Sequence, residues 1–173
     1  MRIRRLRASD DTGAFTSGDL GLDRFLQRHA WQNQDALGIG VTYVALAEDR
    51  IAGYVTVAAG AVERDDLPPD PLAAYPRYPL PALRLARLAV DLRAQGSGVG
   101  NALVDFTLRV ALAMRGRAGR VGVVVDAFPN AVGYYESLGF DTLAALSGSS
   151  PVRPRQVPMY LSLTAVRSEL EAE

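Results

Sequence analysis

The sequence predicts a single α/β domain. Strand-like and helix-like segments alternate along its 173 residues. The most distinctive unit is an apolar run, residues 85–90, followed by a glycine-rich loop and a long amphipathic helix. A chain of this length matches one domain and is long enough to bury a substantial core. Its 49% of hydrophobic and 22% of charged residues are ordinary for a globular protein.

The N-terminal half supplies a strand, a helix and a hairpin. Residues 3–6 form the expected first strand. Apolar residues at three- and four-residue spacing predict a helix over residues 19–31, which Ser17 or Asp19 would cap. β-forming residues alternate in 41–47 and again in 51–58, with a turn between them, and therefore predict a hairpin.

A proline-rich connection and a C-terminal pair of strands complete the order. Six prolines between Pro68 and Pro81, Pro71 among them, make residues 61–84 a long extended loop, because proline cannot sit inside a helix or a central strand. Loops of this length often have a function. Residues 140–145 and 158–163 are expected to be closing strands, and 164–173 a frayed helix or tail.

The glycine-rich loop, residues 93–100, is a candidate anion site. Glycine lets main-chain amides approach an anion closely, and the helix that follows adds free N–H groups and a positive dipole. Glycine count alone leaves a second interpretation open, in which the glycines merely allow tight packing. The spacing fits neither a Rossmann loop nor a P-loop, and the chain contains no lysine.

The helix after the loop has one apolar side and one polar side. Asn101, Asp105 and Arg109 are expected to face solvent. Residues at helical spacing predict the buried stripe, namely Val99, Leu103, Phe106, Val110 and Met114.

A second strand and helix follow. Residues 120–130 form a buried strand and its exit, and 131–140 a short helix that Gly139 terminates at the C′ position. Two adjacent tyrosines, Tyr134 and Tyr135, lie on this helix. Both are consistent with packing of the helix against the sheet.

The loop resembles the acyl-CoA pyrophosphate loop of the GNAT family of N-acetyltransferases. That family carries Gln/Arg-x-x-Gly-x-Gly/Ala, matched here by Gln95-Gly-Ser-Gly98-Val-Gly100 after the strand Arg87-Leu-Ala-Val-Asp91. The resemblance implies a single-domain α/β fold with a mixed, mostly antiparallel sheet, a splayed strand pair and flanking helices. It implies acetyl-CoA as the donor, with these contacts: Leu88, Ala89, Val90, Gln95, Gly96, Ser97, Gly98, Val99, Gly100, Asn101 and Asn130.

The tyrosine segment resembles the same family. Its pattern, Asn-x-x-Ala-x-x-hydrophobic-Tyr-Glu-x-x-Gly-Phe, appears here with a shortened front, since Asn130 stands directly before Ala131. The resemblance implies that Tyr135 lies beside the CoA sulfur. A phenol suits proton donation to the leaving thiolate because its ordinary pKa of about 10 keeps it protonated. Tyr134 takes the apolar position, for which packing is the favoured interpretation.

The N-terminal segment resembles one branch of the family. Residues 15–30 follow Phe-x-Ser/Cys-Gly-x-x-x-Leu-Asp-x-Phe/Tyr-Leu-x-x-x-Ala, which is typical of toxins of toxin–antitoxin pairs. Such toxins acetylate the α-amine of aminoacyl-tRNA, and a ribbon-helix-helix antitoxin neutralises them. The resemblance therefore implies aminoacyl-tRNA and an antitoxin as partners, and is compatible with a homodimer.

Charged residues near the expected active site are substrate candidates. Glu63 follows the second hairpin strand and is a possible water-mediated base. Four arginines are placed to meet phosphates: Arg77, Arg84, Arg87 and Arg93. A zero formal net charge argues against general affinity for RNA, and arginines are commonly paired with acids.

Composition excludes several kinds of chemistry. The absence of cysteine excludes disulfides and thiolate catalysis, and a single histidine, His29, leaves no ligand pair for a metal. His29 is expected on a helix surface. The sequence shows neither a secretory signal nor a membrane-spanning run, so a cytoplasmic protein is expected.

Three functions are compatible with these observations. The first is acetylation of aminoacyl-tRNA by a toxin. The second is acetylation of a small amine, a peptide or a protein N-terminus. The third is a non-catalytic acyl-CoA-binding module, against which Tyr135 and the complete phosphate loop argue.

Overall fold

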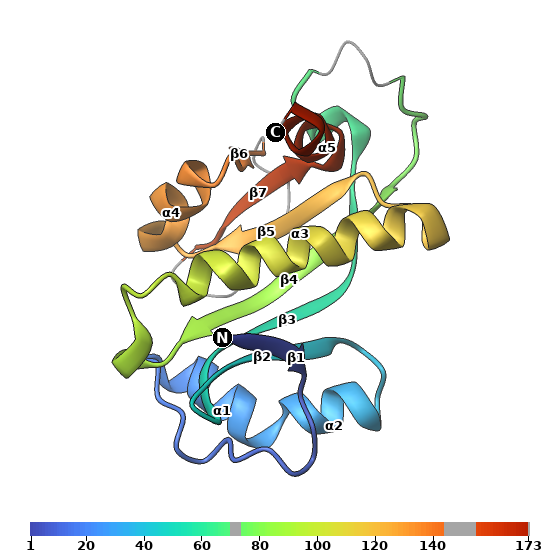
Figure 1. The fold of residues 1–173 in the computed structure, drawn as a ribbon. Coiled ribbons are helices and arrows are strands. Elements are labelled where there is room, and N and C mark those ends of the chain that lie inside the picture. Colours follow the sequence, from blue (N-terminus) through green and yellow to red (C-terminus); the bar gives the residue numbers. More distant parts are fainter. Residues whose placement is uncertain (70–73, 144–154, 173) are drawn as a thin grey trace. The chain divides into compact units, whose positions relative to one another are not determined.

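A computed structural model describes residues 1–69, 74–143 and 155–172 (Figure 1). Its seven-stranded sheet has the order β1-β2-β3-β4-β5-β7-β6. The sheet is mixed, because the arrows of β4 and β5, which helix α3 connects, run in the same direction (Figure 1), whereas β1–β2, β2–β3, β5–β7 and β6–β7 are antiparallel. The expected α/β class with flanking helices is therefore confirmed.

The chain forms two compact units that share three elements. Residues 1–58 and 85–110 form unit 1, and residues 59–84 and 111–173 form unit 2. The shared elements are β3 (Arg50–Val62), β4 (Leu80–Val90) and α3 (Val99–Ala118).

Unit 1 contains the N-terminal strands and helices. Its own elements are β1 (Arg2–Arg5), α1 (Leu20–Arg28), α2 (Ala30–Asp35) and β2 (Val41–Ala47). The predicted hairpin is confirmed, with Tyr43 opposite Val55 and a register shift after Ala45. Asp19, as predicted, caps α1, since its carboxylate accepts from the amides of Gly21 and Leu22 at 2.8 and 3.0 Å.

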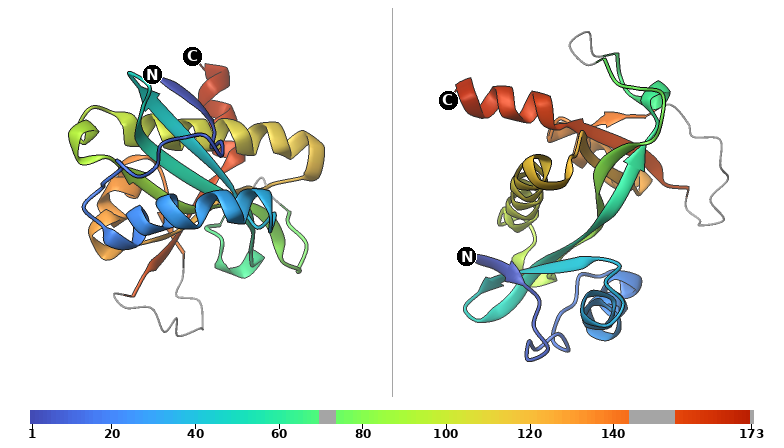
Figure 2. Two further views of the ribbon diagram at one scale, coloured as in Figure 1. Left: turned by 90° about the horizontal axis from the view of Figure 1, so that it is seen from below. Right: turned by 90° about the vertical axis from the view of Figure 1, so that its right-hand side faces the viewer.

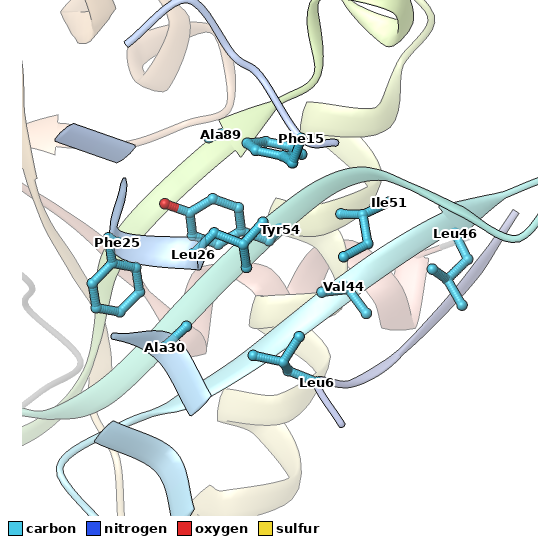
Figure 3. Close-up of a cluster of buried hydrophobic side chains, with 10 residues drawn as sticks. All are labelled: Leu6, Phe15, Phe25, Leu26, Ala30, Val44, Leu46, Ile51, Tyr54 and Ala89. Carbon is cyan, nitrogen blue, oxygen red and sulfur yellow. The ribbon is translucent and has the colours of Figure 1, made fainter. Parts of the chain in front are cut away.

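Helices cover both faces of the unit 1 sheet (Figure 2). On one face, α1 packs its apolar stripe into a cluster around Tyr54 (Figure 3), whose members are Leu6, Phe15, Phe25, Leu26, Ala30, Val44, Leu46, Ile51, Tyr54 and Ala89. On the other face lies α3. A Cβ added to Gly53 would stand 2.8 Å from Val99 and 3.0 Å from Leu103, so glycine at this position allows the close approach of helix and strand.

Unit 2 contains the C-terminal strands. Its own elements are the strands β5 (Gly122–Ala127), β6 (Asp141–Thr142) and β7 (Val157–Ser162), the helices α4 (Val132–Ser137) and α5 (Leu163–Ala172), and short 3₁₀ turns. Gly122 is required where β5 meets β7, because a Cβ there would lie 2.1 Å from the Tyr160 ring. Gly139 ends α4 in the left-handed region, φ 88°, as predicted.

The predicted polar and apolar sides of α3 are borne out. Asn101, Asp105 and Arg109 are exposed, and Asp105 pairs with Arg109 one helical turn later at 2.9 Å. Val99 and Leu103 are buried, and Phe106, Val110 and Met114 are partly buried.

Two predicted boundaries are wrong. The first helix breaks at His29, whose ψ of −29° and φ of −121° leave the helical region, so that α2 turns Gln34 inward. The proline-rich loop is shorter than 61–84, because β3 runs to Val62 and β4 begins at Leu80, where the strands pack Val62, Leu80 and Ala82 into the core. The described part of the C-terminal segment forms the helix α5, one of the two predicted alternatives. Pro71 and residues 144, 145 and 173 lie outside the described residues.

Candidate active site

The strand that precedes the glycine loop ends inside unit 1. Ala89 is buried in the core cluster, and Leu88 and Val90 are partly buried. The main chain continues the sheet by one more bond, from the Asp91 amide to the Ala52 carbonyl at 2.9 Å. The three residues proposed for the thioester are therefore held by a central strand.

The glycine loop has the main-chain geometry of an anion site. Gly96 and Gly98 have φ of 77° and 85°, a region that side-chain-bearing residues rarely adopt, and a Cβ added at either would meet nothing within 4 Å. Packing therefore does not explain these two glycines. The Ala102 amide donates to the Gly98 carbonyl at 3.1 Å, which leaves the preceding amides of α3 outside the helical pattern. Such amides at a helix start attract anions.

Two side chains of the loop donate to main-chain carbonyls of the protein. Gln95 donates from Nε2 to the carbonyls of Ser17 and Val90, at 3.0 and 3.1 Å. Ser97 turns its hydroxyl back to the Ala94 carbonyl. Asn101 is exposed on α3. The part of the loop that remains open to a ligand is thus mainly its backbone.

Arg93 is tied to Asp91, a buried carboxylate with 1% of its surface exposed. Its Nε donates to Oδ1 at 2.8 Å and its NH2 to Oδ2 at 2.9 Å, a two-point contact. These bonds from Arg93, joined by main-chain amides, lower the pKa of Asp91 well below its usual range despite burial. Arg87 lies over the Phe25 ring, 3.8 Å from its centre.

The tyrosine pair lies in unit 2, on α4. Tyr135 is 6% exposed, and its ring meets those of Tyr134 and Phe140 edge to face at 5.2 and 5.4 Å. Burial, with Tyr134 beside it, raises the pKa of Tyr135 above the ordinary tyrosine value. The hydroxyl therefore stays protonated across the physiological range and can donate a proton. Asn130 is exposed in the turn before α4.

The side chain of Tyr134 carries a buried polar atom. Its hydroxyl is buried and has no hydrogen-bond partner among the described residues. Burial also raises its pKa. Packing, the predicted role of Tyr134, does not account for this hydroxyl.

A pocket in unit 2 brings two predicted substrate residues together. The cavity of about 280 Å³ is lined by Glu63 after β3 and by Arg84 on β4, with Asp126 of β5 between apolar walls that include Val124 and Met159. Arg84 donates to Asp126 at 2.5 Å, and both side chains remain partly exposed. Asp126 was not predicted from the sequence. The available signal was an acidic residue near the end of an otherwise apolar strand.

The other predicted residues lie outside these contacts. Arg77 is exposed in the proline-rich connection, and His29 is exposed between α1 and α2, as expected. Within the described ranges, no group of acidic or histidine side chains could hold a metal ion. None of the described helices has the length and apolar character that a membrane crossing requires.

The predicted site residues therefore fall into two groups. Unit 1 holds the thioester strand, the phosphate loop, Arg87 and Arg93, and unit 2 holds Tyr135, Asn130, Glu63, Arg77 and Arg84. This arrangement is typical of α/β acyltransferases. A strand, a glycine loop and a helix come first, and a second strand and a short helix with a buried tyrosine follow. The model of the acetyltransferase (GNAT) domain matches residues 38–142. The chain belongs to this family.

Two proteins similar to the chain act on or bind tRNA according to their names. A tRNA-acetylating toxin of Mycobacterium tuberculosis (strain ATCC 25618 / H37Rv) is 35% identical over 101 residues, which are 58% of this chain and 60% of that toxin. The match thus spans less than two thirds of that toxin's length. The solved structure of AtaT complexed with acetyl-methionyl-tRNAfMet has a TM-score of 0.84 and 25% identity, covering 98% of both chains.

A second solved structure is a tyrosine-to-phenylalanine mutant of KacT. It has a TM-score of 0.81 and 25% identity and covers 98% of this chain and 99% of KacT. The family and the fold that the sequence predicted are therefore confirmed.

Proposed function

We propose that the chain transfers the acetyl group of acetyl-CoA to the α-amine of an aminoacyl-tRNA and so blocks translation. The observation that carries the donor half is the exposed loop with left-handed Gly96 and Gly98 at the start of α3. A pyrophosphate fits it, because main-chain amides and a helix start are what bind phosphates. The acceptor half is supported by the named substrates of the similar toxins.

The reaction joins nitrogen to carbon and breaks the bond from carbon to sulfur. The neutral amine attacks the thioester carbonyl, whose oxygen the main-chain amides of residues 88–90 stabilise. As the sulfur leaves, Tyr135 gives it a proton, and the nitrogen loses one to solvent or to Glu63 through water. The products are the acetylated amine and coenzyme A, and solvent reprotonates Tyr135.

The acceptor would use the pocket of Glu63, Arg84 and Asp126. Its rim carries two carboxylates and one guanidinium, and its walls are apolar. This combination suits an amino group attached to an apolar side chain. The amino acid of the aminoacyl-tRNA has that character.

A small amine is the second candidate acceptor. Three of the four arginines expected to meet RNA phosphates are engaged within the protein, namely Arg84 with Asp126, Arg87 with Phe25 and Arg93 with Asp91. The zero net charge points the same way. In this group, Arg77 would be the residue left for phosphate contact.

Partners and location follow from the toxin function. A ribbon-helix-helix antitoxin would bind the chain, as AtaT is bound to the C-terminus of its antitoxin AtaR in a similar fold. A toxin that acts on translation would work in the cytoplasm, and a homodimer is compatible with this branch.

Expression in a growing bacterium tests the proposal. We expect growth arrest with the wild-type chain, none with Tyr135→Phe, and relief by a ribbon-helix-helix protein encoded directly upstream. Normal growth, together with acetylation of small amines by the purified protein, would favour the second candidate and contradict the toxin function.

A further inference from the structure

The N-terminal motif that resembles the toxin branch has a physical task in the structure. Residues 14–17, which include the start of this motif and are here called the brace, run between α1 and the glycine loop within unit 1. Phe15 anchors the brace, since it is 2% exposed and meets the Tyr54 ring edge to face at 5.5 Å (Figure 3). Tyr54 in turn donates to the Leu22 carbonyl of α1 at 2.8 Å.

A buried carboxylate on α1 fixes the shape of the brace. Asp23 is 7% exposed and accepts from the Ser17 amide at 2.8 Å and from the Ser17 hydroxyl at 2.6 Å. The Thr16 hydroxyl donates to the other carboxylate oxygen at 3.3 Å. Gly18 then turns the chain toward α1 with φ of 92°. These contacts explain the spacing from Phe15 to Asp23, because the Asp23 carboxylate holds the two brace residues that follow Phe15.

The other side of the brace bonds to the segment that leads into the loop. The Leu92 amide donates to the Thr16 carbonyl at 2.8 Å, and the Thr16 amide donates to Asp91 at 3.2 Å. Arg93 reaches the Ala14 carbonyl at 3.2 Å, and Gln95 reaches the Ser17 carbonyl at 3.0 Å. Four bonds therefore link two segments that are more than 70 residues apart in sequence.

We propose that the brace holds the glycine loop in its anion-binding shape, and that Gln95 and Arg93 are positioning residues rather than ligand contacts. The inference rests on the proposed function, in which the loop binds the pyrophosphate of coenzyme A. A loop with glycine at positions 96, 98 and 100 has many accessible conformations and must lose them to bind. The brace removes part of that freedom before the ligand arrives.

Replacement of Gln95 by methionine tests the brace without a change of charge. Methionine fills a similar volume but donates no hydrogen bond, so the links to Ser17 and Val90 are lost. We expect the dissociation constant of coenzyme A to rise about tenfold, in keeping with two ordinary hydrogen bonds. The KM for acetyl-CoA rises with it, while kcat changes less than threefold.

The matched control is Gln34→Met. Gln34 is also a glutamine whose side chain bridges two main-chain segments of unit 1, donating to the Leu6 carbonyl at 3.0 Å and accepting from the Thr42 amide at 2.9 Å. Neither of these hydrogen bonds reaches the brace or the loop. We expect Gln34→Met to lower the melting temperature and leave coenzyme A affinity unchanged.

A second variant acts from the brace side. Gly18→Ala forces a side chain into the left-handed region and brings a Cβ within 3.4 Å of Leu92. It alters no group of the loop itself. We expect a weaker effect of the same sign on coenzyme A affinity.

The experiment uses two measurements. Calorimetry gives the affinity for coenzyme A, and NMR gives the amide exchange of the protein without ligand. Faster exchange of the Thr16 and Leu92 amides in Gln95→Met, together with the weaker binding, supports the brace. Unchanged affinity in that variant, or equal weakening in Gln34→Met, overturns it. A wild-type protein that does not bind coenzyme A overturns the proposed function, and unchanged exchange in Gln95→Met then separately overturns the brace.

Discussion

The glycine loop and the tyrosine helix are stabilised in different ways. Around the loop, Asp91, Arg93 and Gln95 commit their side chains to bonds within the protein, and the backbone is what stays open. On α4, no side chain caps the helix start, and the buried hydroxyl of Tyr134 has no partner among the described residues. In the proposed function, the loop would therefore act through its main chain and the helix through its side chains.

This difference predicts how substitutions divide between binding and chemistry. Changes at the loop alter the shape of a backbone site and should appear in the KM for acetyl-CoA. A change at Tyr135 removes one proton donor from a packed aromatic group and should appear in kcat.

Tyr135→Phe should have the largest effect. Removal of the proposed general acid should lower kcat about a hundredfold, because positioned proton donors contribute about 10² or more. The ring remains, so the contacts with Phe140 and the melting temperature should change little. Steady-state kinetics with saturating acetyl-CoA measures the effect.

Tyr134→Phe is the control for that prediction. Its hydroxyl is buried without a partner, so its removal should leave kcat within threefold and keep or raise stability. An equal loss of activity in both variants would contradict the assignment of the proton to Tyr135.

Asp91→Asn should have the next effect, on stability and with a pH dependence. Because Arg93 and main-chain amides lower the folded-state pKa of Asp91, the charge contributes stability above the ordinary aspartate pKa of about 4, and this contribution is lost as the pH falls below it. We expect asparagine to cost about 2 kcal/mol at pH 7. Urea unfolding from pH 7 to pH 3 should show that the difference in free energy of unfolding between wild type and Asp91→Asn shrinks as the pH falls. A difference that widens toward low pH would contradict the account.

Gly98→Ala should weaken donor binding without an effect on chemistry. A left-handed φ of 85° costs an alanine about 1 kcal/mol, which corresponds to about fivefold in the KM for acetyl-CoA. The control is Gly116→Ala on the exposed part of α3, where no neighbour lies within 4 Å. At this position alanine should raise the free energy of unfolding by about 0.5–1 kcal/mol and leave the KM for acetyl-CoA unchanged.

Asp126→Asn should have the smallest effect and should concern the acceptor. Loss of the carboxylate leaves Arg84 unpaired in the pocket, so we expect the acceptor KM to rise about threefold, while the KM for acetyl-CoA is unchanged. Asp105→Asn, which breaks a comparable surface pair on α3, is the control and should change neither constant. A rise in the donor KM alone would place the pocket on the donor side.

Much of the fold could be predicted because its signals are local. The hairpin, the strand before the loop and the two sides of α3 depend on periodicity, and the turns at Gly98 and Gly139 depend on glycine. The break at His29 could not be predicted, since the apolar spacing continues through it and the change of direction depends on Gln34 reaching β2.

The positions of the site residues could be predicted from the sequence, but the groups to which their side chains bond could not. Gln95 stands where the family pattern has it, yet its side chain donates to the carbonyl of Ser17, which only the tertiary fold brings near. Arg84 was expected to meet phosphate, and its partner Asp126 lies 42 residues away in sequence. Side-chain pairing of this kind has no local signal.

The central claim is tested most directly by acetyl transfer to charged tRNA in vitro. Purified protein is incubated with labelled acetyl-CoA and either aminoacylated or deacylated tRNA. We expect label on the aminoacylated tRNA alone, its release as N-acetyl amino acid on mild base treatment, and almost none with Tyr135→Phe. Equal labelling of both tRNAs, or labelling of free amines without any of tRNA, would contradict the account.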